Sequence, residues 1–122
     1  SQPSYVEEID AIKAVYQHYI DCARTGTGDT MKNAIHDDAN LIGYVGPDLV
    51  AGTIQALYYW NDTNGPASEI EIRFTSIDVV GTCASVRMDM DNWTGHRFTD
   101  FFNLVKFDGQ WKIVSKVFHL HP

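Results

Sequence analysis

The sequence lacks several features that would assign it to a functional class at once. None of its apolar runs approaches the roughly 18 residues that a membrane-spanning helix needs, which predicts a soluble protein. Lys and Arg are scarce, nine against sixteen Asp and Glu, and the formal net charge of −7 disfavours nucleic acid and anionic membranes as partners. The chain carries no P-loop, dinucleotide-binding glycine pattern or Ser-His-Asp series, so we expect no cofactor.

Cysteine is scarcer still, with two residues. Cys22 and Cys83 lie far apart without C-x-x-C spacing, which predicts neither a disulfide framework nor a structural zinc site. His119 and His121 offer two ligands at alternate strand positions without an evident third, so we predict no metal site. The first residues show no secretory-signal pattern, and we therefore expect a cytoplasmic location.

The chain does contain enough apolar material for one packed domain. Hydrophobic residues make up 44% of the 122 residues and aromatic residues 12%, which excludes a disordered chain. This length is typical of a single domain, and we expect residues 1–122 to form one.

Helical periodicity dominates the first half of the chain. Ser4 and Glu7 form a capping box, and apolar residues then recur at three- and four-residue steps as far as Ala23. This pattern predicts a first helix of about five turns. Asp29 and Thr53 are candidate caps of two shorter helices, with one strand at residues 39–45 between them.

Strand periodicity dominates the second half. Alternating apolar and polar residues predict strands at 69–74 and 84–91, followed by two long strands at 96–107 and 110–120. Asp108-Gly109, between the last two, is a strong hairpin signal. Three helices and one early strand followed by an antiparallel meander predict an α+β domain.

The Asp108-Gly109 turn also predicts which residues of the last hairpin share a face. Unbroken alternation places Asp100 opposite Val117 and makes Asp100 and His119 diagonal neighbours on one face. Burial tends to raise the pKa of a carboxyl group toward the range useful for proton transfer. We predict Asp100 and His119 as an acid–base pair, with Tyr16 as hydrogen-bond donor to substrate. A purely structural role of Asp100, as acceptor from Tyr16 or His119, is the alternative.

Further side chains are candidates for lining a ligand pocket near this pair. They are Tyr19, Tyr44, Trp60, Met88, Trp93, His96, Phe98 and Phe102. Each has a structural interpretation too, because buried tyrosines usually find a partner within the core. A histidine beside a turn, such as His96, is typical of a solvated surface position.

Both faces of the last hairpin are about half apolar, whereas a sheet with one wet side shows a cleaner division. Phe101, Val105 and Phe118 would form a larger apolar patch on the second face than a soluble monomer usually exposes. We therefore expect helices to cover one face and a second subunit to cover the other, as in a homodimer.

Several segments resemble the nuclear transport factor 2-like superfamily, in particular its lumazine-binding branch close to the SnoaL-like polyketide cyclases. They are residues 19–21, 28–29, 35–41, 98–104 and 108–118. The resemblance implies a cone-shaped α+β barrel, with three N-terminal helices packed on a curved, mixed, mostly antiparallel sheet. A pocket lies at the open end in such proteins, and many are homodimers through the outer sheet face.

Enzymes of the superfamily that this chain resembles use Asp, His and Tyr in the pocket for acid–base chemistry. The resemblance thus implies an isomerase, dehydratase or cyclase that acts without a cofactor on a small hydrophobic carbonyl or polyketide-like compound. A homodimer that binds a ligand or another protein without catalysis is the alternative, because a fold alone does not determine a function.

Overall fold

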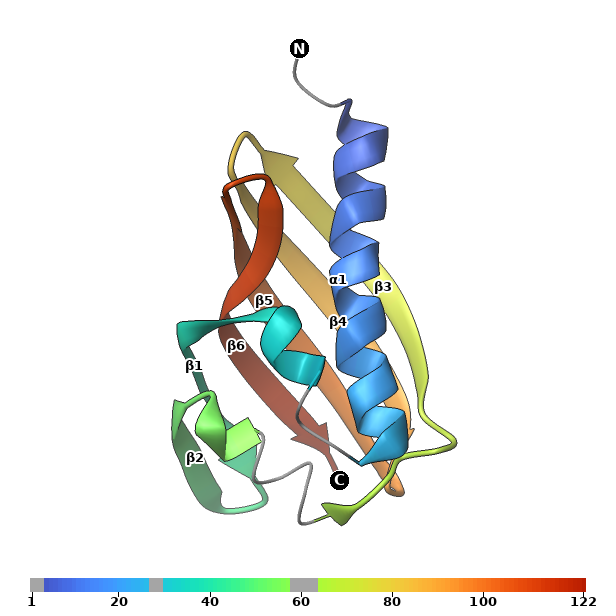
Figure 1. Ribbon diagram of the computed structural model, residues 1–122. Helices are drawn as coiled ribbons and strands as arrows, with labels where there is room; N and C mark the ends of the chain where they lie inside the picture. The colour runs from blue at the N-terminus through green and yellow to red at the C-terminus, as the bar shows by residue number, and fades with distance from the viewer. Residues whose placement is uncertain (1–3, 27–29, 58–63) are drawn as a thin grey trace.

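The computed structural model describes residues 4–26, 30–57 and 64–122, which form one long helix against a curved six-stranded sheet (Figure 1). The elements in chain order are α1 (Tyr5–Thr25), the 3-10 helix η1 (Thr30–Asn33), β1 (Ile35–Val45), β2 (Asp48–Thr53), β3 (Glu71–Val80), β4 (Cys83–Trp93), β5 (His96–Phe107) and β6 (Gln110–His121).

The predicted capping box begins α1. The backbone N–H of Glu7 donates to the Ser4 hydroxyl at 3.2 Å, and the backbone N–H of Ser4 donates to the Glu7 carboxylate at 3.3 Å. The helix ends at Gly26, whose φ of 75° favours glycine. A Cβ there would lie 2.6 Å from the nitrogen of Pro66, so Gly26 also permits a close approach of the segment before β3.

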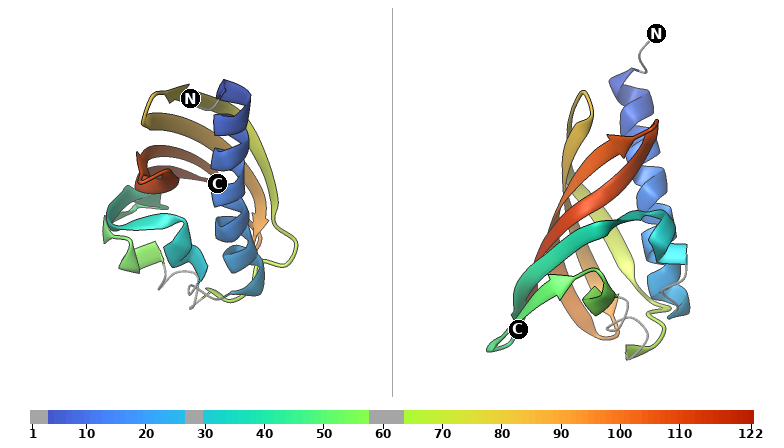
Figure 2. Two further views of the ribbon diagram at one scale, coloured as in Figure 1. Left: turned by 45° about the horizontal axis from the view of Figure 1, so that its top comes forward. Right: turned by 60° about the vertical axis from the view of Figure 1, so that its left-hand side comes forward.

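The sheet has the strand order β2-β1-β6-β5-β4-β3. Every neighbouring pair is antiparallel except β1 and β6, which run parallel. The sheet curves around α1, which lies along one face (Figure 2). The predicted α+β class and the mixed, mostly antiparallel sheet are confirmed.

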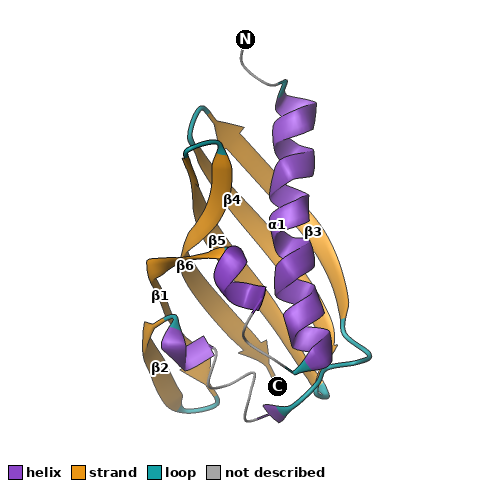
Figure 3. Cartoon of the chain, in the orientation of Figure 1, coloured by secondary structure: helices purple, strands orange, loops and turns teal. Residues whose placement is uncertain are grey.

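The prediction of three N-terminal helices is not supported. Two helices lie wholly within the described residues, α1 and η1, and η1 is a single 3-10 turn in which the N–H of Ala34 bonds to the carbonyl of Met31 (Figure 3). The chain then enters β1 at Ile35, four residues before the predicted strand. Residues 55–57 are helical and adjoin residues 58–63, which lie outside the described part, as does the predicted cap Asp29.

Strand β2 is absent from the sequence-based prediction. Its residues pair with β1 from Val45 opposite Asp48 to Asn40 opposite Thr53, so Gly46 and Pro47 form a tight hairpin turn. Most side chains of β2 are exposed, and an edge strand of this kind has no alternating apolar pattern to reveal it. Thr53, the predicted helix cap, is the last residue of this strand.

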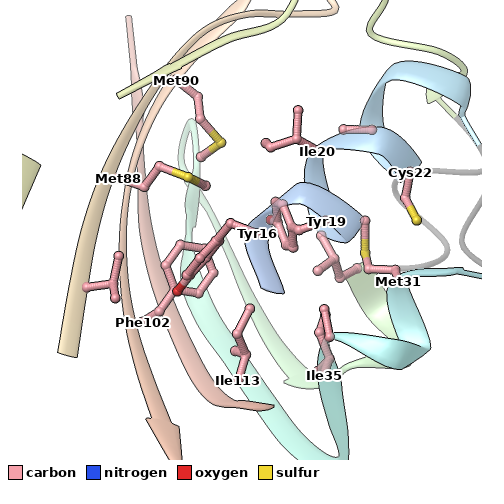
Figure 4. Packing of buried hydrophobic residues seen from close by; sticks show 14 of the residues in the cluster. Tyr16, Tyr19, Ile20, Cys22, Met31, Ile35, Met88, Met90, Phe102 and Ile113 are labelled. Atoms are coloured by element: carbon pink, nitrogen blue, oxygen red, sulfur yellow. The ribbon is translucent and has the colours of Figure 1, made fainter. Parts of the chain in front are cut away.

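The core lies between α1 and the concave face of the sheet. Tyr16 and Tyr19 project from α1 toward Phe102 of β5 (Figure 4). The Tyr16 and Phe102 ring centroids are 5.1 Å apart in an edge-to-face arrangement, and Tyr19 packs on Phe102 at 5.7 Å. The predicted apolar stripe of the first helix faces inward from Ile12 to Ala23, whereas Val6 near its start is 70% exposed.

A β-bulge divides the β5–β6 hairpin. On the turn side, Phe107 pairs with Gln110 and Leu104 with Ile113, as predicted. The next pair is Asn103 with Ser115, so Val114 is an extra residue on β6. Such a bulge breaks the two-residue repeat of a strand, and every later residue of β6 changes face relative to the prediction.

The prediction that Asp100 pairs with Val117 is therefore wrong. Asp100 pairs with Phe118, while Val117 pairs with Phe101, and both of these side chains are about half exposed. Lys116 and Phe118 consequently face the core with Asp100. The physical reason is the extra residue at Val114, which alternation counted from the turn cannot detect.

Candidate functional site

The centre of the site is an ion pair buried beneath α1. The Lys116 Nζ lies 3.4 Å from the Asp100 Oδ2, and the exposed fractions of the two side chains are 8% and 0%. Lys116 comes from β6 and Asp100 from β5, as diagonal neighbours on the concave face. Nζ also donates a hydrogen bond of 2.8 Å to the Tyr19 hydroxyl, so α1 helps to hold the pair.

Four aromatic rings surround the ammonium group. Nζ lies 5.5 Å from the ring centroids of Tyr19, Trp93 and Phe118, and 6.0 Å from that of Phe102. The faces of aromatic rings attract a cation, and the attraction grows when water is excluded. The rings therefore replace part of the hydration that Lys116 loses on burial.

Burial also determines the protonation of the acidic groups near Lys116. Loss of water raises the pKa of Asp100 to about 6, although the positive charge of Lys116 opposes that rise. Burial raises the pKa of Tyr16 and of Tyr19 well above the ordinary value, and the negative charge of Asp100 adds to the effect. Both tyrosines are therefore uncharged phenols at neutral pH, and Asp100 can exchange a proton near it.

Lys116 forms part of the wall of an apolar cavity of about 470 Å³. The cavity lies between the β1–β2 hairpin, residues 56–57 and 64, and the ends of β4, β5 and β6 that are far from the Asp108-Gly109 turn. Its other lining residues are Leu41, Val45, Val50, Ala56, Leu57, Asn64, Trp93, Phe98 and Phe118. A hydrocarbon wall with a few polar groups is typical of small-molecule sites.

The structure brings several of the predicted pocket residues together. Trp93 and Phe98 line the cavity, while Tyr19 and Phe102 enclose the lysine from the core side. Met88 is fully buried on β4, opposite Asp100. Trp60 lies outside the described residues. Most of the predicted set thus surrounds one buried charge pair.

Three predicted positions do not join this cluster. His119 pairs with Thr99 on the outer face, so the predicted Asp100–His119 pair does not form, because the Val114 bulge reverses the alternation. Tyr44 pairs with His119 across β1 and β6 and is 59% exposed on that outer face. His96 lines a separate polar hollow next to Arg97 and the chain end.

Phe118 was predicted for the outer patch and instead lines the cavity, because the same bulge turns it inward. Tyr16 lies where predicted, fully buried on α1, and its hydroxyl has no hydrogen-bond partner among the described residues. Tyr16 is not part of the cavity wall, so it can act only within the buried cluster around Asp100.

Lys116 is the functional residue that sequence reasoning missed. Alternation from the turn assigns it to the outer face, where a lysine is unremarkable. The available signal was Asp100 itself: a carboxylate buried among apolar neighbours requires a cation or hydrogen-bond donors, and Lys116 is two residues beyond Val114 on the adjacent strand. A bulge would have been needed to bring the two together.

Comparison with known proteins assigns the chain to a family. The family model described as "Putative lumazine-binding" matches residues 7–119. The chain belongs to this family of NTF2-like proteins. A curated relative named aldolase FrzH, from a Cladobotryum species, is 32% identical over 116 residues, which cover 94% of this chain and 93% of the relative.

Solved structures agree with the family assignment. An NTF2-like protein of unknown function from Methylobacillus flagellatus KT is 47% identical, covers 99% of this chain and 97% of its own, and superposes with a TM-score of 0.93. Another from Shewanella baltica OS155 is 39% identical, covers 99% of both chains and also has a TM-score of 0.93. The NTF2-like architecture of the chain is thus shown by both sequence and structure.

The described side chains and helices also bear on metal binding and membrane insertion. Within residues 4–26, 30–57 and 64–122, no three His, Cys, Asp or Glu side chains are grouped so that they could hold a metal ion. None of the helices in those ranges has the length and apolar character needed to cross a membrane.

Proposed function

We propose that the protein binds a small, mostly apolar carbonyl compound in the cavity and catalyses acid–base chemistry next to its carbonyl group. Isomerisation, dehydration, cyclisation and aldol-type reactions all proceed through a negative charge on that oxygen. The observation that carries the proposal is the Lys116–Asp100 pair at the wall of the apolar cavity. A cation fixed where water is excluded stabilises such a developing charge.

The polar groups of the wall favour a ligand that accepts hydrogen bonds. Lys116 offers N–H donors, and the buried indole N–H of Trp93 has no acceptor among the described residues. A carbonyl oxygen supplies the missing acceptor, while a hydrocarbon body fits the remaining wall. The aldolase name of the 32% identical relative supports a carbonyl substrate as well.

The residues of the cluster have different proposed roles. Lys116 touches the ligand and polarises its carbonyl group. Asp100 is not among the residues that line the cavity, but it lies 3.4 Å from Nζ, so it fixes the ammonium group and exchanges protons with Nζ or with groups bonded next to it. Tyr19 accepts a hydrogen bond from Lys116 and so helps to position it, while Tyr16 packs within the same buried cluster rather than against the ligand.

The proposal is tested with cyclohexanone, by following the exchange of its α-hydrogens for deuterium by NMR. We expect wild-type protein to accelerate exchange and Asp100→Asn to lose roughly a hundredfold of that acceleration. Lys106→Arg is the matched control, because Lys106 pairs with Glu8 away from the cavity and should leave the exchange rate unchanged. Exchange at the buffer rate with wild-type protein would contradict the catalytic proposal.

A non-catalytic ligand-binding protein is the second candidate, favoured by the largely hydrocarbon wall. Line broadening of cyclohexanone by the wild type without accelerated exchange would support it. Replacement of the cavity residue Phe98 by Trp should then abolish the broadening, because the larger ring occupies the space.

We further propose that the protein is a homodimer through the outer sheet face. Ile42 of β1 pairs with Val117 of β6, which in turn pairs with Phe101 of β5, so their side chains form one apolar row. All three are about half exposed. Light scattering should give twice the mass of one chain, and Phe101→Lys should give a monomer; a monomeric wild type at high concentration would contradict the dimer.

A further inference from the structure

We infer that Lys116 is a nucleophile that forms an imine with the carbonyl carbon of the bound compound. This inference rests on the proposed function, since it assumes an apolar carbonyl compound in the same cavity, and it names the covalent step. The geometry behind it is a lysine with an 8% exposed side chain, part of a hydrocarbon wall and backed by a carboxylate. Lysines that form imines are typically held in such apolar surroundings.

Comparison with Lys106 shows what is particular to Lys116. Lys106 also pairs with a carboxylate, and its Nζ lies 2.8 Å from Glu8 Oε1. Its side chain is 19% exposed, however, and it is not among the residues that line the cavity beside Lys116. Lys13 and Lys32 are exposed to water. An amine on the open surface is not held against a bound carbonyl compound. Lys116 combines exclusion of water with access to a ligand.

Asp100 provides a destination for the Lys116 proton. Transfer of that proton from Nζ to Oδ2, across 3.4 Å, replaces two buried charges with an amine and a carboxylic acid. An apolar ligand that expels water from the cavity favours the uncharged pair, because isolated charges are costly there. Burial has already raised the pKa of Asp100 to about 6, so its acid form is accessible near neutral pH.

The covalent step then balances without any further reagent. The Nζ lone pair forms a bond to the carbonyl carbon, and one N–H proton moves to the carbonyl oxygen to give a carbinolamine. The Asp100 acid protonates the hydroxyl, the C–O bond breaks, and water leaves as nitrogen forms the C=N bond. The products are water, a protonated imine and the Asp100 carboxylate, so the buried ion pair is restored.

The protonated imine withdraws electrons from the neighbouring carbon more strongly than the original carbonyl group. Transfer of an α-proton to the regenerated Asp100 carboxylate beside Nζ then leaves a neutral enamine, whose carbon can attack a second carbonyl group. This is the class of reaction that an aldol-type bond formation requires. The four rings around Nζ stabilise the positive imine nitrogen as they stabilise the ammonium group.

The experiment uses acetylacetone, because an amine that attacks this 1,3-diketone gives a stable vinylogous amide that absorbs in the near ultraviolet. Wild-type protein is incubated at neutral pH, and the adducts are counted by intact mass and located by peptide mapping. We expect one adduct per chain, at Lys116, formed roughly tenfold faster than at Lys106. Lys116→Arg should abolish it, while Lys106→Arg should not change its rate.

A second trap tests the same step with a simple ketone. Sodium borohydride reduces an imine to a secondary amine, so cyclohexanone and borohydride together should add one cyclohexyl group to Lys116. Mapping of the wild type decides the outcome even if Lys116→Arg does not fold. Adducts spread evenly over the lysines, or none at Lys116, overturn the inference.

The two proposals fail in different ways. Accelerated α-hydrogen exchange without any trapped adduct leaves the proposed function standing and removes the imine. A Lys116 adduct without accelerated exchange confirms the nucleophile and contradicts the proposed acid–base catalysis.

Discussion

The two ends of the β5–β6 hairpin each place a lysine against a carboxylate on the concave face, with very different surroundings. Near the turn, Lys106 reaches Glu8 of α1 at 2.8 Å, and the two side chains are 19% and 10% exposed. At the far end, Lys116 and Asp100 are 8% and 0% exposed, 3.4 Å apart, and the lysine borders the cavity. The first pair can still reach water, whereas the second depends on its partner and the rings.

The position of each lysine relative to the bulge, rather than its residue type, accounts for this contrast. On the turn side, where alternation is regular, the concave face is closed by Trp111 and Ile113, both buried. Beyond Val114 the same strand presents Lys116 and Phe118 to the cavity. One extra residue therefore separates a packed half of the hairpin from a half that can bind a ligand.

The largest effect is expected from breaking the deeper pair. Lys116→Met leaves Asp100 buried without a cation and should lower the free energy of unfolding at pH 7 by about 3–5 kcal/mol. Lys106→Met should lower it less, by about 1–3 kcal/mol, because the Lys106 and Glu8 side chains are 19% and 10% exposed whereas Asp100 is fully buried. Urea denaturation of both variants measures the contrast, and equal losses would show that the two pairs do not differ.

A change of pH should alter the free energy of unfolding by a somewhat smaller amount, through the protonation of Asp100. The pKa of Asp100 rises from 3.8 to about 6 on folding, so the native state binds this proton more tightly than the unfolded chain. The stability that this tighter proton binding adds is fully present well below pH 3.8. It declines as the pH rises from 3.8 to 6 and is lost above about pH 6. Wild type should therefore lose about 2–2.5 kcal/mol relative to Asp100→Asn between pH 4 and 7. Urea titrations at each pH measure the difference, and a constant difference contradicts the expectation.

Deleting one residue tests the bulge itself. Without Val114, Ser115 follows Ile113 directly and Lys116 still faces inward. We therefore expect the free energy of unfolding to fall by about 1–2 kcal/mol and the adduct at Lys116 still to form. Deletion of Val117 is the matched comparison. It turns Phe118 outward and His119 inward, and it should lower the free energy of unfolding by more. Thermal unfolding measures both, and a Val114 deletion that costs more than the Val117 deletion would contradict the assigned register.

The smallest effect is expected at His119. Its side chain lies on the outer face, away from Asp100, so His119→Ala should change the free energy of unfolding by less than about 0.5 kcal/mol. The α-hydrogen exchange rate should not change either. A tenfold drop in exchange would mean that His119 contributes to the chemistry from the opposite side of the sheet.

Much of the fold was predictable because its signals are local. The Ser4–Glu7 capping box, the Asp108-Gly109 turn and the strand at 96–107 each depend on residues close in sequence, and all are present in the structure. The edge strand β2 was missed because exposed edge residues carry no apolar alternation. In the site, the burial of Asp100 was predictable from its apolar neighbours, but the identity of its partner was not.

The amino-acid sequence by itself determined the α+β class, the long capped helix and the order of the last four strands, because caps, turns and alternation act over a few residues. Only the tertiary structure decided that Lys116, and not His119, meets Asp100. The position of a bulge depends on how the side chains on both faces of the sheet pack. Their packing partners lie on α1 and on neighbouring strands, far away in the chain.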